Sequence, residues 1–148
     1  MEQFLVSSIH FLKSNEGGVK MNKMFMKEDY VSYEVAKLLK KKGFDWDCIT
    51  YYVDSEPDDV KYSLLFENNT TWEERYCSAP THQMVMKWLR KKHIIIVISP
   101  ECLNIETHCS DWGVEIWWDD NYEEMSETYL TYEDACGAAI KHVLENLN

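Results

Sequence analysis

The segment that most constrains the fold runs from Pro80 to Ser99 and reads PTHQMVMKWLRKKHIIIVIS. Proline in a first helical turn gives up no backbone hydrogen bond, and the hydroxyl of Thr81 can cap the helix. Five β-branched apolar residues, Ile94–Ile98, then follow without polar alternation. Such a run predicts a strand that is covered on both faces at the centre of a sheet. The segment therefore predicts a helix that leads directly into a buried strand.

Two more helices are expected on either side of this segment. Apolar residues recur at helical spacing in Tyr30–Lys42, and Gly43 can adopt the left-handed conformation that ends a helix. Phe44 is then placed to contact the last turn. A final helix opens at Thr131, with Asp134 three residues later in a variant of the capping box.

The strands are expected from alternation and from β-branched or aromatic runs. One expected strand shows a regular alternation: Trp112, Val114, Ile116 and Trp118 alternate with Gly113, Glu115 and Trp117. This pattern indicates a strand with one face buried in the protein. The other expected strands are Ile49–Val53, Lys61–Phe66 and a short Glu127–Leu130. The expected turns are Asp54–Asp59 and Asp119–Asn121.

The order of elements is helix, two strands, helix, two or three strands, helix. Short links between neighbouring strands favour antiparallel pairing. We therefore expect an α+β fold, with a mainly antiparallel sheet of three to five strands covered by three helices. At 148 residues, with no linker or repeat, residues 26–148 are expected to form a single domain.

Residues 1–25 form an N-terminal extension in this interpretation. Glu16-Gly17-Gly18 must be encoded by purine-rich codons just upstream of Met21, as in a ribosome-binding site. We hypothesise that Met21 or Met24 is the true start. The alternative is a short N-terminal helix that packs on the domain or on a partner. A secretory signal is disfavoured, because Glu2 stands where a basic start is expected.

The balance of charge narrows the possible partners. The chain carries 15 basic and 26 acidic side chains, a net charge of −11. This disfavours nucleic acid, whose binding depends on Lys and Arg, and favours basic partners. Five cysteines without tight spacing indicate free thiols in a reducing, cytoplasmic setting. No apolar run is long enough to span a membrane.

Three blocks of the sequence resemble a known family. They are YVSYEVAKLLKKKGFDWDC (Tyr30–Cys48), CSAPTHQMVMKWLRKKH (Cys77–His93) and TYEDACGAAIKHVLENL (Thr131–Leu147). In order and spacing they are similar to a small uncharacterised family found in gut Bacteroidetes genomes, among prophage and other mobile-element genes. The resemblance spans about Met26 to Asn148. It implies a mobile-element origin and a bacterial cytoplasm, and it supplies no catalytic residue because the family has no established activity.

Candidate catalytic and metal-binding residues are few. Cys77 and His82 flank the start of a helix, where a thiol can have a lowered pKa and act as a nucleophile. A buried, unreactive cysteine before a helix cap is the alternative. Cys102, His108 and Cys109 lack the ligand spacing and the fourth ligand of a structural zinc site. We therefore expect no metal and no cofactor.

The best candidate for a functional surface is an exposed aromatic residue beside carboxylates. Trp117 falls on the polar face of its strand, next to Glu115 and Trp118 and before an acidic stretch. Tryptophan is enriched at the energetic centres of protein interfaces. The alternative is a helix that covers this face. We expect a non-enzymatic, acidic accessory protein that binds another protein, of unidentified partner and oligomeric state; a small enzyme using Cys77 with His82 is the second hypothesis.

Overall fold

The computed structural model describes residues 29–101 and 111–146, which form three helices and six strands. The helices are α2 (Tyr33–Lys41), α3 (His82–Arg90) and α4 (Tyr132–Asn146). The strands are β1 (Cys48–Val53), β2 (Glu56–Glu67), β3 (Tyr76–Ser78), β4 (Ile94–Glu101), β5 (Asp111–Trp118) and β6 (Asn121–Glu124). The predicted α+β fold is confirmed. The N-terminal extension and the segment with Cys102, His108 and Cys109 lie outside the described residues.

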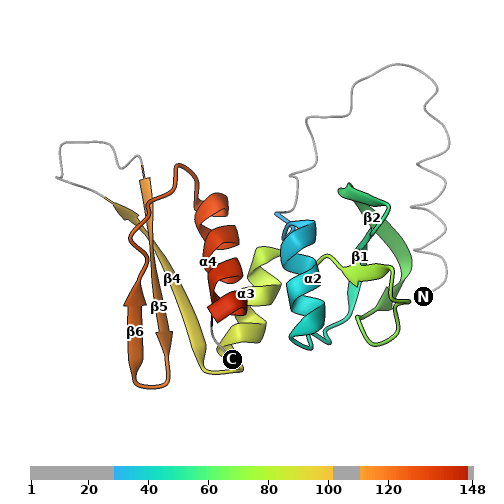
Figure 1. Cartoon of the computed structure of the whole chain (residues 1–148), viewed down its shortest axis with the longest axis horizontal. Coiled ribbons are helices and arrows are strands. Elements are labelled where there is room, and N and C mark those ends of the chain that lie inside the picture. The colour runs from blue at the N-terminus through green and yellow to red at the C-terminus, as the bar shows by residue number, and fades with distance from the viewer. Residues whose placement is uncertain (1–28, 102–110, 147–148) are drawn as a thin grey trace, which may run out of the picture.

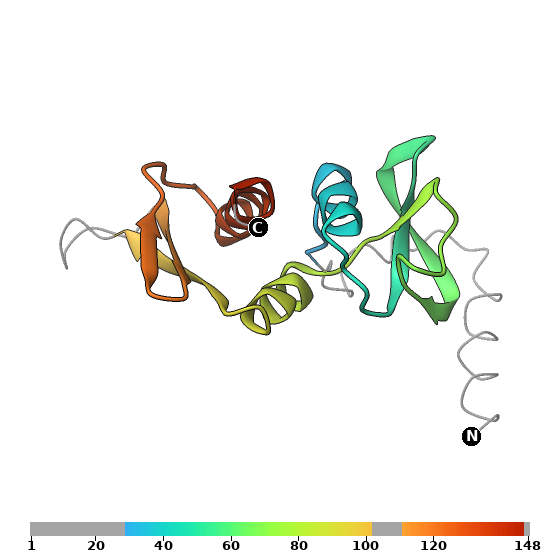
Figure 2. The same ribbon diagram turned by 60° about the horizontal axis from the view of Figure 1, so that its bottom comes forward.

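The strands form two separate antiparallel sheets rather than one. Their orders are β2-β1-β3 and β4-β5-β6. The three helices lie between the sheets, with α4 and α3 beside β4-β5-β6 and α2 beside the other sheet (Figures 1 and 2). Two sheets arise because β3 returns to pair with β1, and α3 then carries the chain to the far side of the helices.

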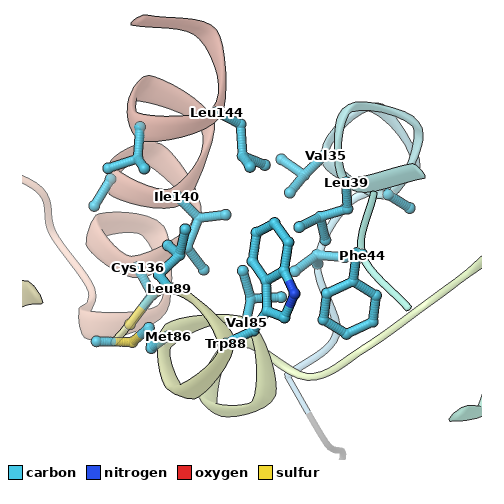
Figure 3. Close-up of a cluster of buried hydrophobic side chains, with 14 of the residues drawn as sticks. Val35, Leu39, Phe44, Val85, Met86, Trp88, Leu89, Cys136, Ile140 and Leu144 are labelled. Atoms are coloured by element: carbon cyan, nitrogen blue, oxygen red, sulfur yellow. The ribbon is translucent and has the colours of Figure 1, made fainter. Parts of the chain in front are cut away.

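The main hydrophobic core is built where the three helices meet. Figure 3 shows side chains from α2, α3 and α4 converging. The rings of Phe44 and Trp88 are in edge-to-face contact, with their centroids 5.5 Å apart. Burial of this apolar area is the main stabilising contribution to the fold. The fully or almost fully buried residues in this view include Val35, Leu39, Phe44, Val85, Leu89, Ile140 and Leu144.

Local capping explains where each helix begins and ends. The hydroxyls of Ser32, Thr81 and Thr131 accept backbone N–H groups from Val35, Met84 and Asp134, at 3.3, 3.3 and 3.0 Å. These bonds satisfy donors that a helix N-terminus otherwise leaves without partners. Gly43 has φ of +79°, as its predicted place after α2 requires.

Several strand boundaries differ from the prediction. The expected turn Asp54–Asp59 is shorter, because β2 already begins at Glu56. The short strands β3 and β6 were not expected. Glu127–Leu130 is not a strand, since only Tyr129 forms an isolated bridge, to Trp112.

The prediction that Ile94–Ile98 forms the central strand is wrong. The run is a strand, but β4 lies at the edge of its sheet and β5 lies at the centre. Ile96 is 8% exposed, whereas Ile95 and Val97 are 47% and 39% exposed. The reason is that α3 and α4 cover only one face of this sheet (Figure 2).

None of the described helices has the length and apolar character that a membrane span needs.

Candidate protein-binding surface

The regular pairing of β4, β5 and β6 sorts their side chains onto two faces. Ile95 pairs with Trp117, which pairs with Tyr122, and Val97 pairs with Glu115, which pairs with Glu124. Side chains of directly paired residues lie on the same face of a sheet. We call the face away from the helices the outer face. Its residues are the apolar Ile95, Val97, Trp117 and Tyr122, the acidic Glu101, Asp111, Glu115 and Glu124, and the small Ser99 and Gly113.

The apolar part of the outer face is open to solvent. Trp117 and Tyr122 are 46% and 47% exposed, and Ile95 and Val97 are similarly accessible. The rings of Trp117 and Tyr122 contact each other with centroids 4.6 Å apart and planes tilted by 50°. Contiguous apolar patches of this kind, rimmed by polar groups, mark sites where proteins bind partners.

Carboxylates border this apolar patch. The Trp117 indole N–H donates to Glu115 Oε2 at 3.3 Å, and the Tyr122 hydroxyl donates to Glu124 Oε2 at 3.3 Å. Loss of hydration raises the pKa of the Tyr122 phenol, and the charges of Glu124 and Glu115 raise it further. The aromatic polar groups are thus already oriented by the two glutamates.

A third carboxylate is positioned by a glycine. The side chain of Glu101 lies directly over Gly113, where a Cβ atom would collide with it. Gly113 therefore lets the Glu101 side chain lie flat against the strand. With Asp111, which pairs with Glu101, the described part of the outer face carries four carboxylates and no lysine or arginine, so its electrostatic potential is negative.

The predicted binding residues separate into two groups. Trp117 and Glu115 lie together on the outer face. Trp118 lies on the opposite face, where it packs against the core. This follows from strand geometry, because successive side chains point to opposite faces. The sequence did not indicate that Ile95, Val97 and Tyr122 belong to this surface. Ile95 and Val97 lie in a run that predicts a strand covered on both faces, and the polar sequence of β6 does not predict a strand.

The structure places Cys77 in β3 and His82 at the start of α3. Cys77 is only 2% exposed, and burial raises the pKa of its thiol to about 11. Burial also lowers the pKa of the His82 imidazole. Among the described residues no hydrogen bond links the two side chains, and His82 Nε2 lies beside Gly137 of α4. A raised thiol pKa disfavours the nucleophilic thiolate.

The described residues contain no group of three or more His, Cys, Asp or Glu side chains placed to hold a metal ion. The acidic residues of β2 are instead used in ion pairs: Lys61 pairs with Glu56 and with Asp59. Glu56, Asp58 and Asp59 thus lie in a strand, where Lys61 supplies a cation for two of them.

A second exposed apolar segment lies at the other end of the molecule. Leu64, Leu65 and Phe66 of β2 are 97%, 67% and 74% exposed. They bulge out of the sheet, because Thr50 pairs with Tyr62 whereas Cys48 pairs with Glu67. The Ser63 hydroxyl holds the bulge by accepting the Leu65 N–H at 3.1 Å.

No family model, curated protein or solved structure matches this chain. The surface is therefore interpreted from its own chemistry.

Proposed function

We propose that this protein acts without catalysis, by binding a basic protein partner through the outer face of β4-β5-β6. The observation that carries the proposal is the exposed row of Ile95, Trp117 and Tyr122 beside a row that includes Glu115 and Glu124. A matching partner presents an apolar ridge flanked by lysine or arginine side chains.

Two physical contributions favour such a complex. Covering the exposed halves of the four apolar side chains contributes about 1 kcal/mol each before the entropic cost of association. Tryptophan and tyrosine lose little side-chain entropy on binding, and the contact between Trp117 and Tyr122 already restricts both rings. The glutamates and the net charge of −11 attract cationic partners and speed their encounter.

The cellular setting completes the proposal. Cys48, Cys77 and Cys136 are buried free thiols, as suits a reducing cytoplasm. The mobile-element origin rests on the family resemblance alone and stays a prediction.

The test compares partner capture by three forms of the full chain: wild type, Trp117→Ala, and Leu64→Ala as a control on the other sheet. We expect the wild type and Leu64→Ala to retain the same basic proteins from a lysate of the native host. Trp117→Ala should lose them, and salt should elute them from the wild type. Retention of the same proteins by Trp117→Ala, or no protein retained specifically by the wild type, overturns the proposal.

A further inference from the structure

Among the strand edges that the structure describes, the edge of β4 is the least protected. Each sheet has two edge strands, β2 and β3 in one and β4 and β6 in the other. Proteins protect such edges with short strands, charges, proline or bulges, because an open edge pairs with other chains. β3 spans three residues and β6 four, with two glutamates, while β2 is bulged and carries several charges.

β4 has almost none of these protections. It pairs with β5 over eight consecutive residues without a bulge, and Ile94–Ser99 contains no charge. Its one proline, Pro100, stands near the end of the strand. Within residues 29–101 and 111–146, no strand pairs with its second edge.

The register shows which backbone groups face this open edge. Trp112 of β5 exchanges backbone hydrogen bonds with Tyr129, at 2.7 and 2.9 Å, and the Val114 carbonyl accepts from Met125 at 3.0 Å. Both residues of β5 thus bond on the side away from β4. Because backbone groups alternate in direction along a strand, the intervening residues, such as Gly113 and Glu115, bond toward β4.

The isoleucines of β4 therefore direct their backbone groups outward. Val97 and Ser99 exchange hydrogen bonds with Glu115 and Gly113, so the N–H and C=O groups of Ile94, Ile96 and Ile98 point to the open edge. Pro100 belongs to the same set, where its missing N–H costs no bond to β5.

Charge at the two ends of β4 selects the orientation of an added strand. Arg90, Lys91, Lys92 and His93 precede the strand, and Glu101 ends it. An antiparallel second copy of β4 places the acidic end of each copy beside the basic end of the other. A parallel copy would place like charges together, which opposes that arrangement.

The geometry points to a twofold dimer in which β4 pairs antiparallel with β4 of a second copy of this chain. In this register Ile96 lies opposite Ile96 of the second copy, and Ile94 lies opposite Ile98. All the outward N–H and C=O groups of the three isoleucines then find partners. Pro100, which has no N–H, lies outside these pairs. The β4-β5-β6 sheets of the two copies then form one six-stranded sheet. Edge pairing leaves both outer faces open, so this inference is independent of the proposed function.

This register places Ile95 of one copy beside Val97 of the other, on the exposed outer face. It therefore allows a charge test that leaves the core untouched. The double variant Ile95→Lys with Val97→Lys sets lysines opposite each other, whereas Ile95→Lys with Val97→Glu sets lysine opposite glutamate. The two variants differ at one exposed residue, so their folding should be alike.

The experiment is sedimentation equilibrium of the full chain at micromolar concentrations, with circular dichroism to verify folding. We expect wild type and the lysine–glutamate variant to sediment at twice the chain mass of 17.6 kDa. The dilysine variant should sediment at the single-chain mass, with dimerisation weakened at least tenfold. A monomeric wild type, or a dilysine variant that dimerises as well as the lysine–glutamate variant, overturns the inference.

Discussion

The two sheets differ in how their strands pair. In β4-β5-β6 the pairing is continuous, and apolar side chains alternate between a face packed on α3 and α4 and the outer face. In β2-β1-β3 the pairing is interrupted twice, between Cys48 and Thr50 and between Tyr51 and Val53. A regular sheet satisfies its backbone by strand pairing, whereas an irregular one leaves groups that need other partners.

Side chains supply those partners in β2-β1-β3. Lys40 Nζ donates to the carbonyls of Glu73, Glu74 and Tyr76, at 3.1, 3.1 and 2.5 Å. Asn69 bridges the Phe44 carbonyl and the Ser78 N–H, each at 2.9 Å. Alternation of apolar residues is therefore sufficient for β4-β5-β6, while β2-β1-β3 depends on single polar side chains from distant parts of the sequence.

The largest effect is expected from a cavity in the regular sheet. Ile116 is fully buried at the centre of β5. Ile116→Ala should lower the free energy of unfolding by about 2–5 kcal/mol. Urea denaturation measures this, with Glu115→Gln on the outer face as the control. A loss below about 1 kcal/mol would show that packing of β5 on the helices contributes little.

Removing one polar side chain should weaken the irregular sheet. Lys40→Met keeps the alkyl chain but leaves three carbonyls without their shared donor. We expect a loss of about 1–3 kcal/mol in urea denaturation. Lys41→Met, an exposed neighbour in the same helix, should change stability by less than about 0.5 kcal/mol. Equal effects of the two substitutions would show that the hydrogen bonds of Lys40 do not stabilise this sheet.

Alkaline pH should destabilise the fold through the buried thiols of β1, β3 and α4. Burial raises the pKa of Cys48, Cys77 and Cys136 to about 11 each. The unfolded chain ionises these thiols at lower pH, so stability is full below about pH 8.5 and falls as the pH rises toward 11. The loss near pH 10 should be about 2 kcal/mol for each thiol. Urea denaturation across this range measures it, and an unchanged loss in Cys77→Ala would contradict the assignment.

The smallest effect is expected at the bulge of β2. Leu64 is 97% exposed, so Leu64→Ser removes no buried contact. Its free energy of unfolding should stay within about 0.5 kcal/mol of the wild type. A larger loss in urea would mean that Leu64 is covered in solution.

The sequence was sufficient where structure is determined locally. The three helices were predicted because capping hydroxyls, Gly43 and helical periodicity act within a few residues. The same holds for β5, whose alternation placed Trp117 outside and Trp118 inside. For these elements, the residues that form the sequence pattern also make the contacts that stabilise the element.

The rest depends on contacts between distant residues. A run such as Ile94–Ile98 shows high strand propensity but does not reveal how many neighbours a strand has, so β4 was placed at the centre. β3 and β6 are too short to show a period. Tyr122 lies on the outer face because it pairs with Trp117, and the sequence of β6 does not indicate that pairing. Division into two sheets likewise follows from the return of β3 to β1.

Two neighbouring isoleucines of β4 test most directly whether the outer face is open to solvent in the folded chain. Ile95 is 47% exposed on the outer face and Ile96 is 8% exposed on the inner face. Measured by urea denaturation at low protein concentration, Ile95→Lys should change the free energy of unfolding by less than about 1 kcal/mol. Ile96→Lys should cost more than about 4 kcal/mol or prevent folding, because it buries a charge. Equal, large losses for both would show that the outer face is covered in the folded chain and would contradict the account.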